Sequence, residues 1–246
     1  MCTWHRLLLE DYQFLPAIFR QSNLALSNRQ GLTKLGGGKR KNNSMNEKLN
    51  LKIEAALSLE ISEERKEILQ TLIDYIKRKR KAEAPIRLNF ICTHNSRRSQ
   101  FSQIWAQTAA DYFQIPAQCY SGGVEVTACN ERAVASLDRF GFIMSKRGHS
   151  NPVYIVFHTE DARPILVFSK LFDDPVNPHS SFASVMTCDH ADENCPFIPG
   201  AEARIPVRYD DPKAFDDSPQ EAEKYDERSL QIASEMFYVF SRVGTT

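Results

Sequence analysis

The sequence contains no apolar run that approaches the roughly 18–20 residues needed to span a bilayer. Its first apolar stretch, residues 7–9, is far too short for the hydrophobic region of a secretory signal and soon meets Glu10 and Asp11. The sequence also lacks net charge, because 31 Lys and Arg balance 31 Asp and Glu, so no overall field favours nucleic acid or a membrane as a partner. We therefore expect a soluble, cytoplasmic protein that binds neither.

A nucleotide-binding phosphate loop is absent too, because no Gly-Lys-Ser/Thr follows the glycines of LGGGKRKNNS, residues 35–44, at the needed spacing. That segment is instead typical of a flexible basic linker. The residues before it lack a sustained apolar period, whereas a helical pattern begins at Met45. We expect Met45 to be the biological start and residues 1–44 to be a flexible extension outside the mature protein. A transit peptide is the alternative.

The sequence has six cysteines, and in a reducing compartment clustered thiols indicate catalysis or metal binding more often than structural disulfides. We expect two of them, Cys119 and Cys129, to be packing residues. The full set is Cys2, Cys92, Cys119, Cys129, Cys188 and Cys195.

With 246 residues, 42% of them hydrophobic, the chain can bury one good core and a small accessory element. A helix is predicted over residues 62–81, with Ser62 as its N-cap, because apolar residues recur there at helical spacing. Its basic end suits a helix C-terminus and need not bind anything. The predicted buried face consists of Ile68, Leu69, Leu72, Ile73 and Ile76.

From residue 86 onward, short strand-forming runs alternate with helical runs. This alternation predicts an α/β fold with a small parallel sheet flanked by helices on both faces. In such sheets the ligand site lies beyond the carboxyl ends of the strands, and Cys92 and Cys188 both stand at such ends. The predicted strands are 86–92, 118–121 before a Gly-Gly turn, 182–188 and 203–207, the predicted helices are 99–113, 130–140 and 221–243, and 153–157 with 165–168 is predicted to form an extra hairpin.

The segment FICTHNSRRSQ, residues 90–100, predicts an oxyanion-binding loop with a nucleophile at its floor. Backbone N–H groups of the loop converge at the start of the following helix, and Arg98 can bind a tetrahedral oxyanion with two parallel donors. The same positive surroundings favour the thiolate form of Cys92, to which Ser99 can donate. The alternative is an inert buried cysteine with Arg98 on the surface. The residues of the predicted loop are Thr93, His94, Asn95, Ser96 and Arg97.

FICTHNSRRSQ resembles the phosphate-binding loop of the low-molecular-weight protein tyrosine phosphatases, and more closely that of the thioredoxin-coupled arsenate reductases of the same fold. The resemblance covers roughly residues 86–243 and implies a flavodoxin-like arrangement. It therefore predicts a catalytic domain over 85–246, preceded by a helical segment over 45–84. His94 stands where the family usually has glycine, and Arg97 where many members have a second cysteine.

The segment MTCDHADENCPFIPGAE places Cys188 and Cys195 seven residues apart, and three interpretations compete. With His190 between them, the two cysteines could be zinc ligands, although no fourth ligand stands nearby at finger-like spacing. They could also be two unrelated structural cysteines. The third interpretation is a thiol relay. The resemblance favours it, because the thioredoxin-coupled reductases carry a cysteine pair at this spacing before a proline and ordinary phosphatases of the fold lack it.

For such a relay the resemblance implies a definite chemistry. Cys92 attacks arsenate, and Cys188 then attacks the Cys92 sulfur, which releases arsenite and leaves a disulfide between these two residues. Cys195 attacks Cys188 and frees Cys92. A thioredoxin-like protein finally reduces the pair, and we expect the polar stretch 189–194 to be a flexible loop that carries it outward. No cofactor is required.

The segment RYDDPKAFDD follows the fourth predicted strand and is expected to supply a proton donor for the leaving group. In the family this residue is an aspartate directly before a proline, which corresponds here to Asp211, with Asp210 as a neighbouring alternative. An ordinary Asp-Pro turn would have the same sequence. Lys213 and Ala214 follow where phosphatases commonly have aromatic residues, which weakens the phosphatase hypothesis.

Some reductases of the family hold a potassium ion beside the loop. Asn95 and Ser121 match positions of that site, but Gln103 stands where a glutamate is expected, and a lost carboxylate lowers the attraction for a cation. We therefore assign no metal ligand, and the potassium site stays an open alternative. The leading hypothesis is therefore an arsenate reductase acting on a small oxyanion. The alternatives are a phosphatase acting on phosphomonoesters and a non-enzymatic thiol or zinc-binding sensor.

Overall fold

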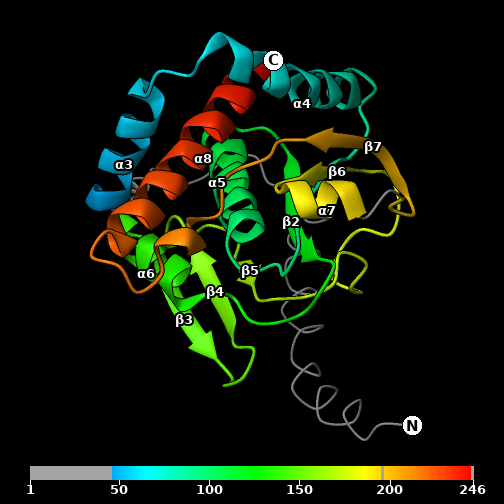
Figure 1. Cartoon of the computed structure of the whole chain (residues 1–246). Coiled ribbons are helices and arrows are strands. Elements are labelled where there is room, and N and C mark those ends of the chain that lie inside the picture. Colours follow the sequence, from blue (N-terminus) through cyan, green and yellow to red (C-terminus); the bar gives the residue numbers. More distant parts are fainter. Residues whose placement is uncertain (1–45, 195–196, 245–246) are drawn as a thin grey trace, which may run out of the picture. The chain divides into compact units, whose positions relative to one another are not determined.

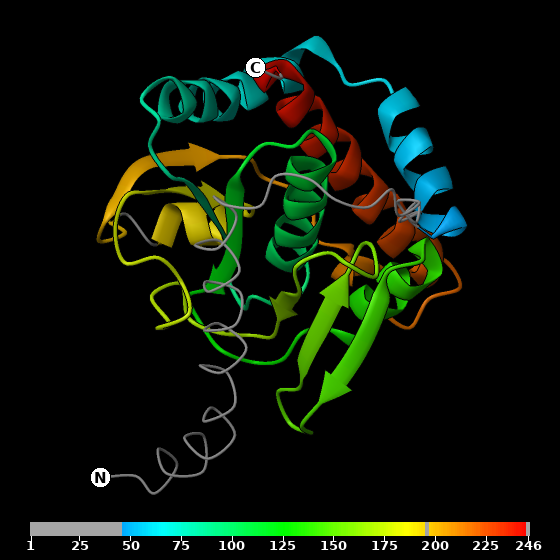
Figure 2. The ribbon, with the colours of Figure 1, turned by 180° about the vertical axis from the view of Figure 1, so that it is seen from behind.

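The computed structural model describes residues 46–194 and 197–244 (Figures 1 and 2). The predicted extension and linker over 1–44, the predicted start at Met45, and Cys2 and Cys195 lie outside these residues. Within the described residues no helix is long and apolar enough to cross a membrane.

A four-stranded parallel sheet forms the centre of the molecule (Figure 1). The strand order is β2-β1-β6-β7, and each neighbouring pair runs parallel. The first strand, Ile86–Cys92, is almost completely buried, as expected for a strand with neighbours on both sides and helices packed against it. This sheet confirms the predicted α/β fold class. Its strands are β1 (Ile86–Cys92), β2 (Ala117–Gly123), β6 (Phe182–Met186) and β7 (Ala201–Pro206).

One face of the sheet carries the main hydrophobic core. Leu88 and Phe90 of β1 point into this core, where they join Trp105 from α5 and Phe237 from α8. The two helices lie side by side in Figure 1, and the buried Trp105 indole donates to Ser229 Oγ at 2.9 Å. The helices are α3 (Glu47–Ser58), α4 (Glu63–Lys81), α5 (Arg98–Tyr112), α6 (Glu131–Phe140), α7 (Asp189–Asn194), α8 (Glu221–Val243) and the short 3₁₀ helix η2 (Pro212–Phe215).

The opposite face carries a second, smaller cluster. Ile91 of β1 and Met186 of β6 point into it, because alternate residues of a strand face opposite sides of the sheet. The short helix α7 covers this side through Ala191, and Cys92 and Cys188 belong to the same cluster. The two predicted site thiols thus share one buried environment beneath α7.

The helix α4 begins as predicted, but its buried face contains Tyr75 in place of the predicted Ile68. Ser62 is its N-cap and accepts from Arg65 N at 3.3 Å. The prediction that Ile68 is buried is wrong, because this residue is 38% exposed. The remaining predicted core residues are fully buried: Leu69, Leu72, Ile73 and Ile76.

A separate antiparallel sheet contains the predicted hairpin and one strand that the sequence pattern did not indicate. The hairpin is β4 (Val153–Phe157) with β5 (Ile165–Val167), and the additional strand β3 (Ile143–Arg147) pairs with β4. Most of β3 is exposed, so it lacks the apolar alternation that marks a strand. It follows Gly141, whose φ of 93° ends α6 in the left-handed conformation that glycine favours.

The predicted Gly-Gly turn is wrong, because Gly122 and Gly123 continue β2 alongside β1. Glycine is required there for close approach. A Cβ on Gly122 would lie 2.3 Å from the Phe172 Cα, and one on Gly123 would lie 2.7 Å from the Asn95 backbone nitrogen. The end of β2 therefore packs directly against the loop that follows Cys92.

Candidate active site

The Cys92 thiol lies at the topological switch point of the sheet. The chain leaves β1 for β2 on one side and later returns to β6 on the other. Open α/β sheets bind ligands at the carboxyl end of such a central strand. Cys92 is the last residue of β1 and is only 4% exposed, and α5 begins six positions later at Arg98.

A short chain of hydrogen bonds orients the Cys92 sulfur. Its Sγ lies 3.0 Å from Ser99 Oγ, and the Asn95 amide nitrogen donates to the same Ser99 oxygen at 2.8 Å. Because Ser99 accepts from Asn95, its own hydroxyl proton is available for Cys92. A hydroxyl that donates to the sulfur stabilises a thiolate more than a thiol.

The loop is supported from the segment that leaves β5. Asn95 has a φ of 46°, and its Oδ1 accepts from Lys170 N at 3.1 Å. Ser169 Oγ donates to the His94 carbonyl at 2.8 Å. Gln100 Nε2 donates to the carbonyls of both Asn95 and Phe168, at 2.9 and 2.8 Å. The extra antiparallel sheet therefore has a structural role, since its last strand delivers these contacts to the loop.

The strand β2 supports the other side of the loop. Backbone N–H groups of Val124 and Glu125 both donate to the Thr93 carbonyl, at 2.8 and 2.9 Å. The His94 ring lies 3.2 Å from a Glu125 carboxylate oxygen, and Ser96 Oγ donates to the Ala128 carbonyl at 2.7 Å. The loop is thus fixed on both sides while its centre faces the Cys92 sulfur.

Arg98 and Asp211 lie together. The Arg98 guanidinium donates to the Tyr209 carbonyl at 2.9 Å and to Asp211 Oδ2 at 2.8 Å. Its Nε is buried and has no hydrogen-bond partner among the described residues. A buried donor without a partner is costly, so this N–H is suited to an oxyanion bound in the loop.

The neighbouring acid Asp210 points elsewhere. Its side chain is 95% exposed and pairs with Arg228 at 3.2 Å. Asp211 instead caps η2 by accepting from Lys213 N at 3.1 Å and remains beside Arg98. Of the two aspartates, only Asp211 therefore lies where a proton donor for the loop is needed.

Arg97 ties the loop to the segment that carries Asp211. Its Nε donates to the Tyr225 hydroxyl at 2.8 Å, and its NH2 group lies 3.4 Å from Asp216. The Tyr225 hydroxyl in turn donates to Asp216 at 2.7 Å. Burial beside Asp216 raises the pKa of Tyr225 well above its ordinary value, so it stays a neutral donor.

The second thiol lies close to the loop. Cys188 is 1% exposed, and its Sγ lies 3.5 Å from the hydroxyl of Thr93, the residue next to Cys92. The Ala191 backbone N–H donates to the same sulfur at 3.4 Å. Cys188 stands two positions after the end of β6, so the chain delivers it to the same edge of the sheet as Cys92.

The prediction of a flexible loop over 189–194 is wrong, because these residues form α7. Asp189 and Asp192 of this helix pair with Arg208, and Asp192 also accepts from Arg204 Nε at 2.9 Å. These ion pairs provide the physical reason for the ordered structure. The third thiol of the relay, Cys195, lies outside the described residues. The zinc hypothesis, which requires Cys188, His190 and Cys195, therefore stays a prediction. Within residues 46–194 and 197–244, no three His, Cys, Asp or Glu side chains are grouped to hold a metal ion.

Cys119 and Cys129 are packing residues, as predicted. They are 7% and 2% exposed and belong to the main core. Burial raises the pKa of the Cys129 thiol to about 12 and that of Cys119 well above its usual value. Both are therefore neutral thiols with low reactivity.

The residues of the family's potassium site surround a lysine that sequence reasoning missed. Ser121 Oγ donates to Gln103 Oε1 at 2.5 Å, and the Lys170 ammonium lies 3.3 Å from the same Ser121 oxygen. Lys170 is 3% exposed and stacks over the Phe168 ring, with 4.6 Å to the ring centre. A cation of the protein itself thus occupies this polar cluster. The available signal was a single charged residue two positions after the apolar run 165–168.

Burial of Lys170 predicts a stability effect that depends on pH. Burial lowers its pKa to about 8, so folding at neutral pH requires desolvation of an ammonium group. We expect Lys170→Met to raise the melting temperature at pH 7. Between pH 8 and roughly 10.4, the ordinary lysine pKa, the unfolded wild type binds more protons than the folded form, so its stability rises with pH and the advantage of the variant fades.

Calorimetry of both proteins from pH 7 to 10 checks this expectation. Lys77→Met, which changes an exposed lysine of α4, is the matched control and should leave the melting temperature unchanged. A Lys170→Met protein that is less stable than wild type by the same amount at every pH would contradict the expectation.

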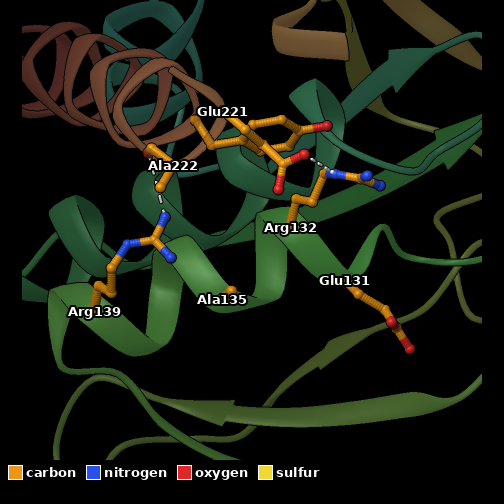
Figure 3. A pocket seen from close by; sticks show the side chains of 7 residues that line it. Glu131, Arg132, Ala135, Arg139, Glu221 and Ala222 are labelled. Atoms are coloured by element: carbon orange, nitrogen blue, oxygen red, sulfur yellow. Dashed lines mark hydrogen bonds and ion pairs between the residues drawn. The ribbon is translucent and has the colours of Figure 1, made fainter. Parts of the chain in front are cut away.

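A cavity of about 310 Å³ lies apart from the thiols, between α6 and α8 (Figure 3). Its arginines are neutralised, because Arg132 pairs with Glu221 at 2.6 Å and Arg139 pairs with Asp226 at 2.7 Å. The cavity therefore offers no unpaired positive group for an oxyanion, and the Cys92 loop remains the candidate site. The lining residues are Glu131, Arg132, Ala135, Arg139, Glu221, Ala222 and Tyr225.

Structural comparison finds two distant likenesses. A low-molecular-weight phosphotyrosine phosphatase from Vibrio cholerae shares 14% identity, and the match covers 63% of this chain and 94% of that one with a TM-score of 0.42. A thioredoxin-dependent arsenate reductase from Corynebacterium glutamicum shares 16% identity, with coverage of 88% and 93% and a TM-score of 0.33.

Sequence comparison gives a closer relation, although no protein-family model matches the chain. Arsenate reductase 2 of Staphylococcus epidermidis is 32% identical over 124 residues, which are 50% of this chain and 76% of that protein. An arsenate reductase of Staphylococcus aureus strain Newman matches with the same identity and coverage. The chain therefore belongs to the arsenate reductase family of the low-molecular-weight protein tyrosine phosphatase fold.

Proposed function

We propose that this chain reduces arsenate to arsenite through Cys92, Cys188 and Cys195, and that a thioredoxin-like protein returns the thiols to the reduced state. The observation that carries the proposal is the position of Cys188. It is buried in the same cluster as Cys92, and its sulfur contacts the hydroxyl of Thr93 at 3.5 Å. A phosphatase needs no second thiol at this position, whereas a reductase must supply two electrons from a thiol pair.

In the first step, the Cys92 thiolate attacks arsenic and an oxygen of arsenate leaves as water. Arg98 binds the remaining oxygens, and its unpartnered Nε is available for this contact. Asp211 supplies the proton for the departing oxygen. A bound oxyanion competes with Asp211 for Arg98.

In the second step, the Cys188 thiolate attacks the Cys92 sulfur. The new S–S bond replaces the S–As bond, whose electron pair stays on arsenic and reduces it from As(V) to As(III). Cys195 then attacks Cys188, moves the disulfide to these two residues and frees Cys92. A dithiol of the thioredoxin type accepts the disulfide and restores the starting state.

A phosphatase acting on phosphomonoesters is the second candidate. The specific observation in its favour is that Arg98 pairs with Asp211 and stands next in the chain to Ser99, which contacts the Cys92 sulfur. A cysteine, an arginine and an aspartate suffice to form and hydrolyse a phosphocysteine. The residues after Pro212 argue against a phosphotyrosine substrate, because Lys213 and Ala214 offer no aromatic ring to hold one.

The loop predicts the effect of two substitutions. Cys92→Ser should lower the rates of arsenate reduction and aryl-phosphate hydrolysis by several orders of magnitude, because a serine hydroxyl is not ionised there at neutral pH. Arg98→Lys should fail nearly as badly, because an ammonium cannot form the bidentate clamp. Steady-state assays with both substrates measure these losses. Cys119→Ala and Arg132→Lys are the matched controls, and turnover by either loop variant at a control's rate would remove the loop from the mechanism.

The relay predicts a split between the two activities. Cys188→Ser should stop arsenate turnover but spare any phosphomonoester hydrolysis, because water resolves a phosphocysteine without a second thiol. Cys195→Ser should trap a disulfide between Cys92 and Cys188 after one turnover with arsenate and no reductant. Peptide mapping detects this bond. Should both variants keep full arsenate turnover with thioredoxin, the pair is structural and the phosphatase becomes the leading candidate.

A further inference from the structure

The Thr93 hydroxyl lies between a thiol and an imidazole. Its Oγ1 is 3.5 Å from Cys188 Sγ and 3.4 Å from His190 Nδ1. A hydroxyl can accept one proton while it donates another. With the ring proton on Nε2, Nδ1 accepts from Thr93, and the three groups form a continuous path from the buried sulfur to an exposed ring.

The relay requires such a path because Cys188 must react as a thiolate. Cys188 is 1% exposed and lies in an apolar cluster, so its thiol proton cannot pass directly to solvent. The sulfur contacts the Ala191 N–H at 3.4 Å and the Thr93 hydroxyl at 3.5 Å. Neither of these can keep the thiol proton, so a base must receive it.

The imidazole of His190 is suited to receive the proton. It is the side chain type that changes charge near neutral pH, and its exposure lets the proton pass on to solvent. Two acids of its own helix, Asp189 and Asp192, pair with arginines. The charged groups near it are Asp189, Asp192 and Glu193 on α7, Arg204 and Arg208 that pair with this helix, and the His94–Glu125 pair across the loop.

We propose that His190 is a positioning residue that draws the proton from Cys188 through the Thr93 hydroxyl. The Cys188 proton moves to Thr93 Oγ1 as the Thr93 proton moves to His190 Nδ1, which leaves a thiolate and an imidazolium. The thiolate then attacks Cys92 as described above. This inference rests on the proposed thiol relay, but the proton path exists whether or not arsenate is the substrate.

The reactivity of Cys188 tests the path without any turnover. In a fully reduced Cys92→Ser protein, the rate of alkylation of Cys188 by iodoacetamide is followed from pH 5 to 9 by peptide mass spectrometry. We expect His190→Gln and Thr93→Val each to slow alkylation at pH 7 by about tenfold, toward the low end of general-base effects, and to shift the pH profile upward. Thr93→Ser keeps the hydroxyl and should restore the rate.

His149→Gln changes an exposed histidine of the turn between β3 and β4 and is the matched control. If His190 has only a structural role, His190→Gln lowers the alkylation rate of Cys188 by the same factor at every pH or leaves it unchanged. Wild-type alkylation profiles for both His190→Gln and Thr93→Val would overturn the path. Because His190 is exposed, its substitution is not expected to prevent folding.

The two proposals fail in distinguishable ways. With Cys92 intact, His190→Gln should slow arsenite release about tenfold in a single turnover and leave aryl-phosphate hydrolysis unchanged. If wild type releases no arsenite but the alkylation rates behave as expected, the proton path stands and the reductase proposal fails. If wild type reduces arsenate while the variants alkylate at the wild-type rate, the path fails and the reductase proposal stands.

Discussion

The site depends on the backbone turn at Asn95. Its φ of 46° lies in the left-handed region, which Asn tolerates better than most residues with a Cβ. In this conformation one side-chain amide serves both sides of the loop, since its nitrogen donates to Ser99 at 2.8 Å and its oxygen accepts from Lys170 N at 3.1 Å. Because Ser99 contacts the Cys92 sulfur, Asn95 couples the nucleophile to the segment that leaves the antiparallel sheet.

Strand register brings the two thiols together across 96 positions of sequence. The strand β6 pairs with β1 up to Ile91, and Thr187 extends this pairing by donating to the Ile91 carbonyl from its backbone nitrogen at 2.8 Å and from its hydroxyl at 2.9 Å. Cys188 therefore emerges at the level of the loop. A shift of one residue in this register would turn the Cys188 side chain to the other face of the sheet, away from Thr93.

Sequence patterns predicted the limits of β1 and α8 to the residue, because both are long, strongly patterned segments with turn-forming neighbours. The proton-donor role of Asp211 near the loop was predicted from the resemblance to a family and not from the sequence patterns. They missed Lys170, because its burial depends on three segments that are remote in sequence and meet around Ser121. They also predicted a turn at Gly122 and Gly123. Glycine is required at these positions because Phe172 and the loop approach too closely to leave room for a Cβ.

An ordered α7 is compatible with the movement that the proposed relay requires, because little free energy holds this helix in place. The helix has only six residues, too few to be stable alone, and its ends are tied to the sheet by arginines. The Arg208–Asp189 pair joins side chains that are 45% and 71% exposed, and such pairs typically contribute at most about 1 kcal/mol. The burial of Ala191 and Cys188 therefore retains α7 together with the ion pairs of Asp192, which is only 10% exposed. In the proposed relay, a disulfide between Cys188 and Cys92 would replace the hydrogen bonds of the Cys188 sulfur with Thr93 and Ala191, and its formation would itself weaken the hold on the helix.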